Sequence, residues 1–135
     1  MATVAKSGTP SLSSIIDPSE AQAYQVGSGL KAGEDIAAGD VVYIASTGRF
    51  MKSNGTAATA PAKVRGIALA AASSGEALTV YRGVEVRYGS GMTPGAQLFA
   101  SATAGLLDDA ATTGGTAAVG YVVDATRIFI HGSFY

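Results

Sequence analysis

IAAGDVVYIASTGRF, residues 36–50, is the stretch that decides the fold. It places a turn glycine, Gly39, shortly before an apolar segment, and a second glycine, Gly48, after small polar residues. Because glycines and small polar residues mark tight turns between strands, Val41–Ala45 is predicted to be a buried β-strand. Gly48–Lys52 is predicted to be its hairpin partner.

The same pattern returns in residues 92–107, MTPGAQLFASATAGLL. The matched positions are Gly39 with Gly95, Tyr43 with Phe99, and Gly48 with Gly105. Further along, VRGIAL at 64–69 corresponds to VGYVV at 119–123, and LTVYRG at 78–83 to RIFIHG at 127–132. The sequence therefore predicts two similar strand units, as pseudo-repeats over about 33–83 and 89–132.

Short apolar runs separated by glycine turns dominate the chain, and no stretch has a convincing helical period. This pattern predicts an all-β fold, a small β-barrel or β-sandwich, formed by residues 26–135 as one domain. The alanine-rich segment 68–77 has room for a single helical turn. The length of 135 residues fits one domain with an N-terminal arm.

Composition limits the classes of partner. The formal net charge is −1 and 14% of residues are charged, so we expect no nucleic-acid partner and no anionic membrane surface. Ala, Gly, Ser and Thr make up about half of the chain, whereas Leu, Ile, Val and Phe make up about a fifth. A core this lean suggests that further apolar surface is buried against other subunits.

Cysteine is absent, so the chain has no disulfide and no thiol nucleophile. The first residues lack the uninterrupted apolar core of a signal peptide, and no apolar run has the length of a membrane span. We therefore expect a protein that is made in a cytoplasm.

Residues 1–25 are predicted to be an extended arm, because Pro10 and Pro18 interrupt regular structure. The arm carries three apolar residues that are candidates for contact with a partner: Leu12, Ile15 and Ile16. Two interpretations remain open. The segment either folds onto its own domain, or becomes ordered on a partner by adding a strand to a sheet edge. At the other end, Phe134 and Tyr135 are candidates for a subunit interface, because exposed aromatic side chains need cover.

Residues typical of catalysis are few. His131 is the only histidine, which excludes a site with several histidine ligands and favours a surface or interface role. Ser133 and Asp124 lie nearby in sequence, which does not make a triad. The carboxylates lie in predicted turns without the spacing of a calcium loop: Glu34, Asp35, Asp40, Asp108 and Asp109.

The glycine clusters GSGLKAG (27–33) and GSGMTPG (89–95) lack the spacing of phosphate-binding loops. The aromatic residues are spread over many strands, which does not predict a stacking platform. We therefore expect no catalytic residue, no cofactor and no metal, and we expect that the protein is not an enzyme.

The segments GEDIAAGDVVYIASTGRF, KVRGIALAAASSGEALTVYRG and GAQLFASATAGLLDDAATTGGTAAVGYVVDATRIFI resemble the head decoration, or capsid cement, proteins of tailed bacteriophages, over about residues 30–130. The resemblance implies a β-rich homotrimer that binds the major capsid protein on the outer surface of an expanded capsid and stabilises it. It also implies localisation in the virion, on the capsid exterior, and an N-terminal arm that becomes ordered on the capsid.

Two other functions remain open. A ligand-binding or glycan-binding β-module of a tail fibre or surface assembly would show an aromatic-lined groove. A small β-type enzyme would show a concave site with clustered polar groups, and the single His131 makes it the least favoured of the three.

Overall fold

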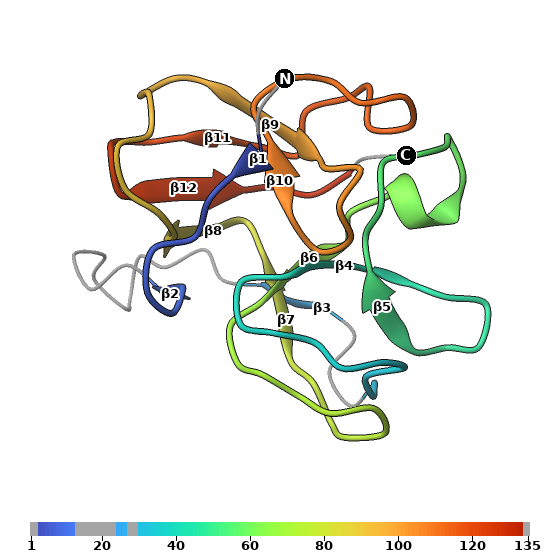
Figure 1. The fold of residues 1–135 in the computed structure, drawn as a ribbon. Helices are drawn as coiled ribbons and strands as arrows, with labels where there is room; N and C mark the ends of the chain where they lie inside the picture. Colours follow the sequence, from blue (N-terminus) through green and yellow to red (C-terminus); the bar gives the residue numbers. More distant parts are fainter. Residues whose placement is uncertain (1–2, 13–23, 27–29, 134–135) are drawn as a thin grey trace.

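The computed structural model describes residues 3–12, 24–26 and 30–133, which form two antiparallel sheets. From edge to edge, the seven-stranded sheet contains β1 (Thr3–Val4), β10 (Leu107–Asp108), β9 (Gln97–Ala100), β11 (Gly120–Val122), β12 (Arg127–Ile130), β8 (Val84–Arg87) and β2 (Ser11–Leu12). The five-stranded sheet contains β3 (Tyr24–Val26), β7 (Val80–Arg82), β6 (Gly66–Ala68), β4 (Val41–Ile44) and β5 (Phe50–Lys52). Figure 1 shows the larger sheet above the smaller one. The predicted all-β class is confirmed, as an open sandwich rather than a closed barrel.

The two sheets are built from similar strand units. The order β5-β4-β6-β7 in one sheet is repeated as β10-β9-β11-β12 in the other. The register is repeated as well, since Val42 lies opposite Gly66 in the first unit and Leu98 lies opposite Gly120 in the second. These are the pairs expected if the matched glycines at 39 and 95 begin equivalent strands.

Glycine fixes the turns of both units. Six matched glycines have a positive φ, which L-residues rarely adopt: Gly39, Gly48 and Gly83 in the first unit, and Gly95, Gly105 and Gly132 in the second. The φ angles of the first matched pair, Gly39 and Gly95, are 87° and 84°. The turn positions read from the sequence are therefore the positions at which the backbone requires glycine.

The core lies in two clusters, one on each side of the five-stranded sheet. Val41 and Ile67 point toward the seven-stranded sheet and pack with Leu98, Val122 and Ile128 on its inner face. On the opposite side, the cluster consists of Val42, Phe50, Ala68 and Val80 with the loop residues Ala32, Ile36, Ala72 and Leu78. The molecule therefore has three layers, with the seven-stranded sheet outermost on one side and loops on the other.

Small differences from the sequence prediction concern the ends of elements. Only the central residues of Val64–Leu69 form a strand, β6. The one short 3₁₀ helix in the described residues, η1 (Ala60–Ala62), precedes that strand. The segment 68–77 contains turns instead of the helical turn for which it had room. Pro61 in the first turn of η1 explains the position of the helix, because proline is preorganised for helix starts.

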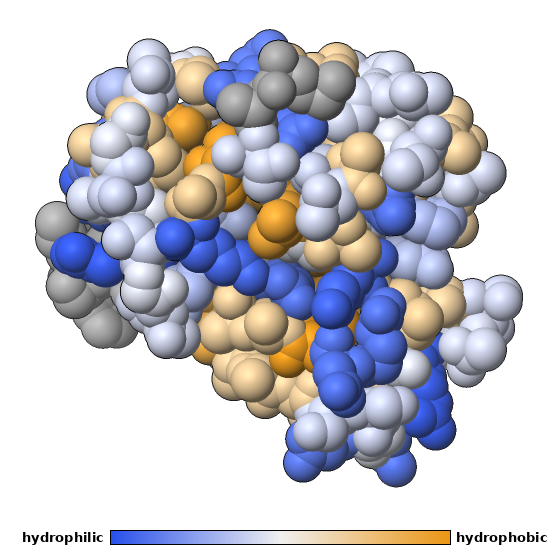
Figure 2. Space-filling model, viewed as in Figure 1, coloured by the Kyte–Doolittle hydropathy of each residue, from blue (hydrophilic) through white to orange (hydrophobic). Residues whose placement is uncertain are grey.

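The surface hides most of its apolar side chains. In the view of Figure 2, the most apolar residues lie recessed between pale and blue residues. The described part of the chain contains no helix with the length and apolar character needed to cross a lipid bilayer.

Gly120 tests the packing of the second unit. A methyl group at this position would overlap the carbonyl oxygen of Phe129 in the neighbouring strand. We expect Gly120→Ala to lower the free energy of unfolding by about 2 to 3 kcal/mol, because overpacking forces the backbone to shift. Urea unfolding followed by circular dichroism measures this change.

Gly48→Asn is the control, since a side chain at Gly48 meets no atom within 4 Å and asparagine tolerates a positive φ. Its cost should be about 1 kcal/mol or less. An equal loss of stability in the two variants would contradict the close approach of strands at Gly120.

Candidate functional site

Residues 3–12 form an N-terminal strap that joins the two edges of the seven-stranded sheet. At its start β1 pairs with β10, where Thr3 lies opposite Asp108. At its end β2 pairs with β8, where Leu12 lies opposite Val86. Between these strands the amide of Ser7 donates a hydrogen bond to the carbonyl of Tyr88, at 2.8 Å. This part of the predicted arm is therefore part of the domain.

An ion pair fixes the middle of the strap. The Lys6 ammonium lies 2.7 Å from Oδ1 of Asp40, and the side chains are 19% and 6% exposed. The other carboxylate oxygen of Asp40 accepts a hydrogen bond from the Ala37 amide, at 2.8 Å. Since a buried carboxylate needs partners for both oxygens, Asp40 is held by the strap and by its own turn together.

Pro10 holds the strap against the first strand unit. Its side chain is buried and fits the space beside Gly39, where a methyl group on the glycine would overlap it. Gly39 thus has two roles, because it makes the turn before β4 and leaves room for the strap.

Tyr88 lies beneath the strap and is fully buried. Burial, together with the nearby negative charge of Asp40, raises the pKa of the Tyr88 phenol far above its ordinary value. Its hydroxyl group has no hydrogen-bond partner among the described residues. The ring therefore acts as a core side chain, and the hydroxyl adds no stabilising contact.

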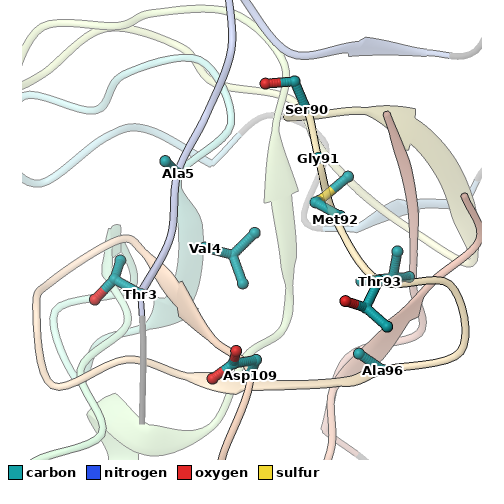
Figure 3. Close-up of a pocket in the computed structure, with 10 residues that line it drawn as sticks. Thr3, Val4, Ala5, Ser90, Gly91, Met92, Thr93, Ala96 and Asp109 are labelled. Atoms are coloured by element: carbon teal, nitrogen blue, oxygen red, sulfur yellow. The ribbon is translucent and has the colours of Figure 1, made fainter. Parts of the chain in front are cut away.

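A pocket of about 420 Å³ lies beside the strap (Figure 3). Thr3, Val4 and Ala5 of the strap form one side, and the loop from Ser90 to Thr93 forms the other. Val4, Met92 and Ala96 also pack against the core, so the pocket has an apolar floor. Thr3, Ser90, Thr93 and Asp109 supply polar groups among its lining residues. These groups can bind a small ligand or a protein side chain, but they do not include a pair suited to acid–base catalysis.

A second group of polar side chains lies at the β11–β12 turn. Arg127 binds Asp124 through two nitrogens and lies 2.9 Å from Oε1 of Glu85. Hydrogen bonds from Arg127 and from the Thr126 amide hold the pKa of the Asp124 carboxyl well below its usual range. The Asp124 carboxylate also accepts a hydrogen bond from the Arg127 amide, as expected for an aspartate in a turn.

The residues considered for a triad have structural contacts instead. Ser133 is buried and its hydroxyl accepts a hydrogen bond from the Val64 amide, at 2.9 Å. Nδ1 of His131 lies 2.7 Å from the carbonyl of Gly132. Asp124 is bound to Arg127. Each of the three side chains therefore has a contact of its own, and they do not form a triad.

The turn carboxylates have similar roles. The Glu34 carboxylate accepts a hydrogen bond from the Lys52 amide, at 3.0 Å. The Asp35 carboxylate accepts one from the Ser74 amide, also at 3.0 Å. Asp108 is buried beside β1, and one of its oxygens has no hydrogen-bond partner in the described chain. Across residues 3–12, 24–26 and 30–133, no three Asp, Glu or His side chains gather as a potential metal site.

The candidate contact residues fall mostly outside the described ranges. Leu12 is the last residue of β2, and its backbone pairs with β8. Ile15, Ile16, Phe134 and Tyr135 lie outside the described residues, so their roles stay predictions.

Sequence reasoning missed the strap contacts of Lys6 and Asp40. It also did not predict that Tyr121 and Phe129 stack, with ring centroids 5.3 Å apart. The sequence holds one indication of this contact. Both residues lie in strands of one predicted hairpin, β11 and β12, and hairpin pairing brings such residues opposite each other.

Removing the Lys6 charge should release the strap. In Lys6→Ala, Asp40 keeps a buried charge without its counterion, so we expect the Ser7 amide to exchange with solvent about tenfold faster or more, which corresponds to about 1.4 kcal/mol. Hydrogen exchange followed by NMR measures this rate. Lys31→Ala, at an exposed position, is the matched control and should leave the Ser7 rate unchanged. Equal Ser7 rates in wild type and Lys6→Ala would show that the ion pair does not hold the strap.

Tyr88 predicts a dependence on alkaline pH. Its folded-state pKa is raised, so the stabilisation is complete below the unfolded pKa of about 10 and is lost as the pH rises further, by about 1.4 kcal/mol per pH unit. Tyr88→Phe should remove this loss and should leave stability at neutral pH within about 1 kcal/mol of wild type. Urea unfolding at neutral and alkaline pH tests both points. Tyr43→Phe is the control and should keep the alkaline loss; a loss of the same size in Tyr88→Phe would assign it to another group.

Comparison of the chain with protein-family models, with curated proteins and with solved structures found no match.

Proposed function

We propose that this protein is a structural virion protein that binds the outer surface of an expanded phage capsid and stabilises it. The observation that carries the proposal is the agreement between the segments that resemble decoration proteins and the elements of the fold. Those segments contain β4 and the first residue of β5, then β6 and β7, and then β9 to β12. They also contain the turn glycines at which φ is positive, such as Gly39 and Gly105.

The side-chain chemistry of the described residues supports a binding role. The side chains of Ser133, Glu34 and Asp40 accept hydrogen bonds from backbone amides and so hold backbone segments in place. Such contacts stabilise a frame and leave its surfaces for recognition. The pocket beside the strap offers hydroxyl groups, a carboxylate and an apolar floor, which suit an inserted side chain of a partner protein.

Binding to an assembled lattice explains how such a frame stabilises a capsid. A protein that binds the assembled shell and not its free subunits shifts the equilibrium toward the shell by mass action. In the homotrimer that the resemblance implies, several contacts with the major capsid protein act together, which raises the overall affinity without new types of contact.

Co-sedimentation tests the proposal. The purified full chain is mixed with expanded capsids of the same phage that lack it, and we expect it to sediment with them and to raise the temperature at which they break. A chain that stays in the supernatant and leaves the capsids equally heat-sensitive would refute the proposal. Glycan-array binding by that chain would then support the ligand-binding alternative, with the pocket as its site.

The same assay tests the predicted capsid contacts. The double variant with Ile15→Ser and Ile16→Ser should bind capsids at least about tenfold more weakly, because buried apolar anchors dominate binding energy. Its urea unfolding curve should match that of wild type. Unchanged capsid affinity would show that these isoleucines are not contacts.

A further inference from the structure

The pocket beside the strap is held in shape by the seven-stranded sheet. Its lining comes from the strap, from the loop that joins β8 to β9, and from positions at or next to the ends of β9, β10 and β11. Two hydrogen bonds fix the loop: the Met92 amide donates to the carbonyl of Ala125, at 3.2 Å, and the Gly95 amide donates to the carbonyl of Val122, at 2.8 Å. At about 420 Å³ the pocket lies within the usual range of ligand sites, roughly 300 to 1,000 Å³.

The floor of the pocket is apolar. Val122 is buried in the main core cluster, and Val4, Met92 and Ala96 are half-buried and pack against that cluster. Figure 3 shows Val4 of the strap and Met92 of the loop on opposite sides of the pocket. A chain of methylene groups between them is removed from water on both sides, which favours a ligand with an aliphatic part.

The rim of the pocket is polar and negatively charged. Asp109 is the charged residue of the lining, and in Figure 3 it lies at the same end as Thr93, with Ser90 at the other end. Asp109 already has an interaction within the chain, but an ionised carboxylate has about four acceptor sites and accepts further hydrogen bonds. The neighbouring Asp108 adds a second formal negative charge, and none of the described lining residues is basic.

The basic side chains around the pocket do not cancel this charge. Lys6 follows the lining residues of the strap, and its ammonium is paired with Asp40. Arg127 is paired with two carboxylates. Arg87 follows the core residue Val86 in β8, so the alternation along a strand directs it to the sheet face that points away from the core. The pocket therefore suits a positively charged group better than an anion.

Three other classes of ligand fit these groups less well. An anion meets Asp109 without a basic partner among the lining residues that the structure describes. A sugar lacks the aromatic surface expected of a glycan-binding module, since none of the described lining residues is aromatic. A purely apolar side chain covers the rim and takes water away from its polar groups. An aliphatic stem with a cationic head matches both floor and rim, and its head stays near water because Asp109 is exposed.

We propose that the pocket binds an aliphatic cation, the side chain of a lysine or arginine that a partner protein presents, with the cationic head at Asp109 and the stem between Val4 and Met92. This inference deepens the proposed function and rests on it for the identity of the partner. The preference of the pocket for a cation is testable without a capsid.

NMR titration of the full chain tests the proposal with two probes, Nα-acetyl-lysine methylamide and Nα-acetyl-arginine methylamide. We expect a dissociation constant on the order of 1 mM for at least one of them, as for a ligand of this size, with shifts at the amides of Val4, Ala5 and Met92. The tighter probe identifies the head group. The norleucine counterpart keeps the stem without the charge and should bind about fivefold more weakly or worse. Added salt should weaken binding of the cationic probes and leave norleucine unchanged.

Two variants test the site itself. Asp109→Asn removes the charge of the rim and should reduce the affinity for the cationic probe to that for norleucine. Asp35→Asn is the matched control, because it makes the same chemical change at an exposed position in the first strand unit, and it should bind as wild type does. Thr93→Arg places a guanidinium group at the rim and should abolish probe binding. Circular dichroism and urea unfolding show whether each variant is folded.

Equal affinities for the lysine, arginine and norleucine probes would overturn the inference, as would wild-type affinity in a folded Asp109→Asn. A chain that sediments with capsids but binds neither cationic probe keeps the proposed function and loses this inference. A chain that binds a cationic probe through Asp109 but does not sediment with capsids supports this inference and refutes the proposed function.

Discussion

The structure depends on one contact, the burial of the first strand unit against the inner face of the second. Each unit is a short-stranded sheet with few large apolar residues, and such a sheet is not stable alone. Val41 and Ile67 from one unit and Leu98 and Val122 from the other close the main cluster. Loops then cover the far side of the first unit with Ile36 and Leu78. A chain this poor in large apolar residues therefore obtains its core by stacking three thin layers.

The strap connects these layers to one another. It contributes strands to both edges of the larger sheet and reaches the first unit through Lys6 and Pro10. The Lys6–Asp40 ion pair and the Pro10 ring beside Gly39 thus hold the layers together, which a larger apolar core would otherwise do. The same strap forms a wall of the pocket, so the shape of the binding surface depends on how firmly the N-terminal residues are held.

Much of the fold follows from local sequence. The turn glycines and the apolar segments around Tyr43 and Phe99 determine where strands begin and end, and the repeat predicts equal strand orders. The strap contacts do not follow from local sequence, because Lys6 and Asp40 are 34 residues apart and nothing in either segment specifies the other. The pairing of Tyr121 with Phe129 requires the hairpin register, which the turn Asp124–Arg127 sets through side-chain hydrogen bonds. Polar contacts between distant segments and the register of this hairpin therefore could not be predicted from the sequence.

The pairing of β1 with β10 also has a consequence for the folding pathway. Thr3 and its partner Asp108 are far apart in sequence. Contacts of such long sequence separation slow folding, because closing a long loop costs entropy before the contact forms. On the ribosome, the first unit emerges with the face of Ile67 uncovered until the second unit has been made. The growing chain is therefore most vulnerable to aggregation before the second unit has been made, and β1 can pair with β10 only after β10 has been synthesised.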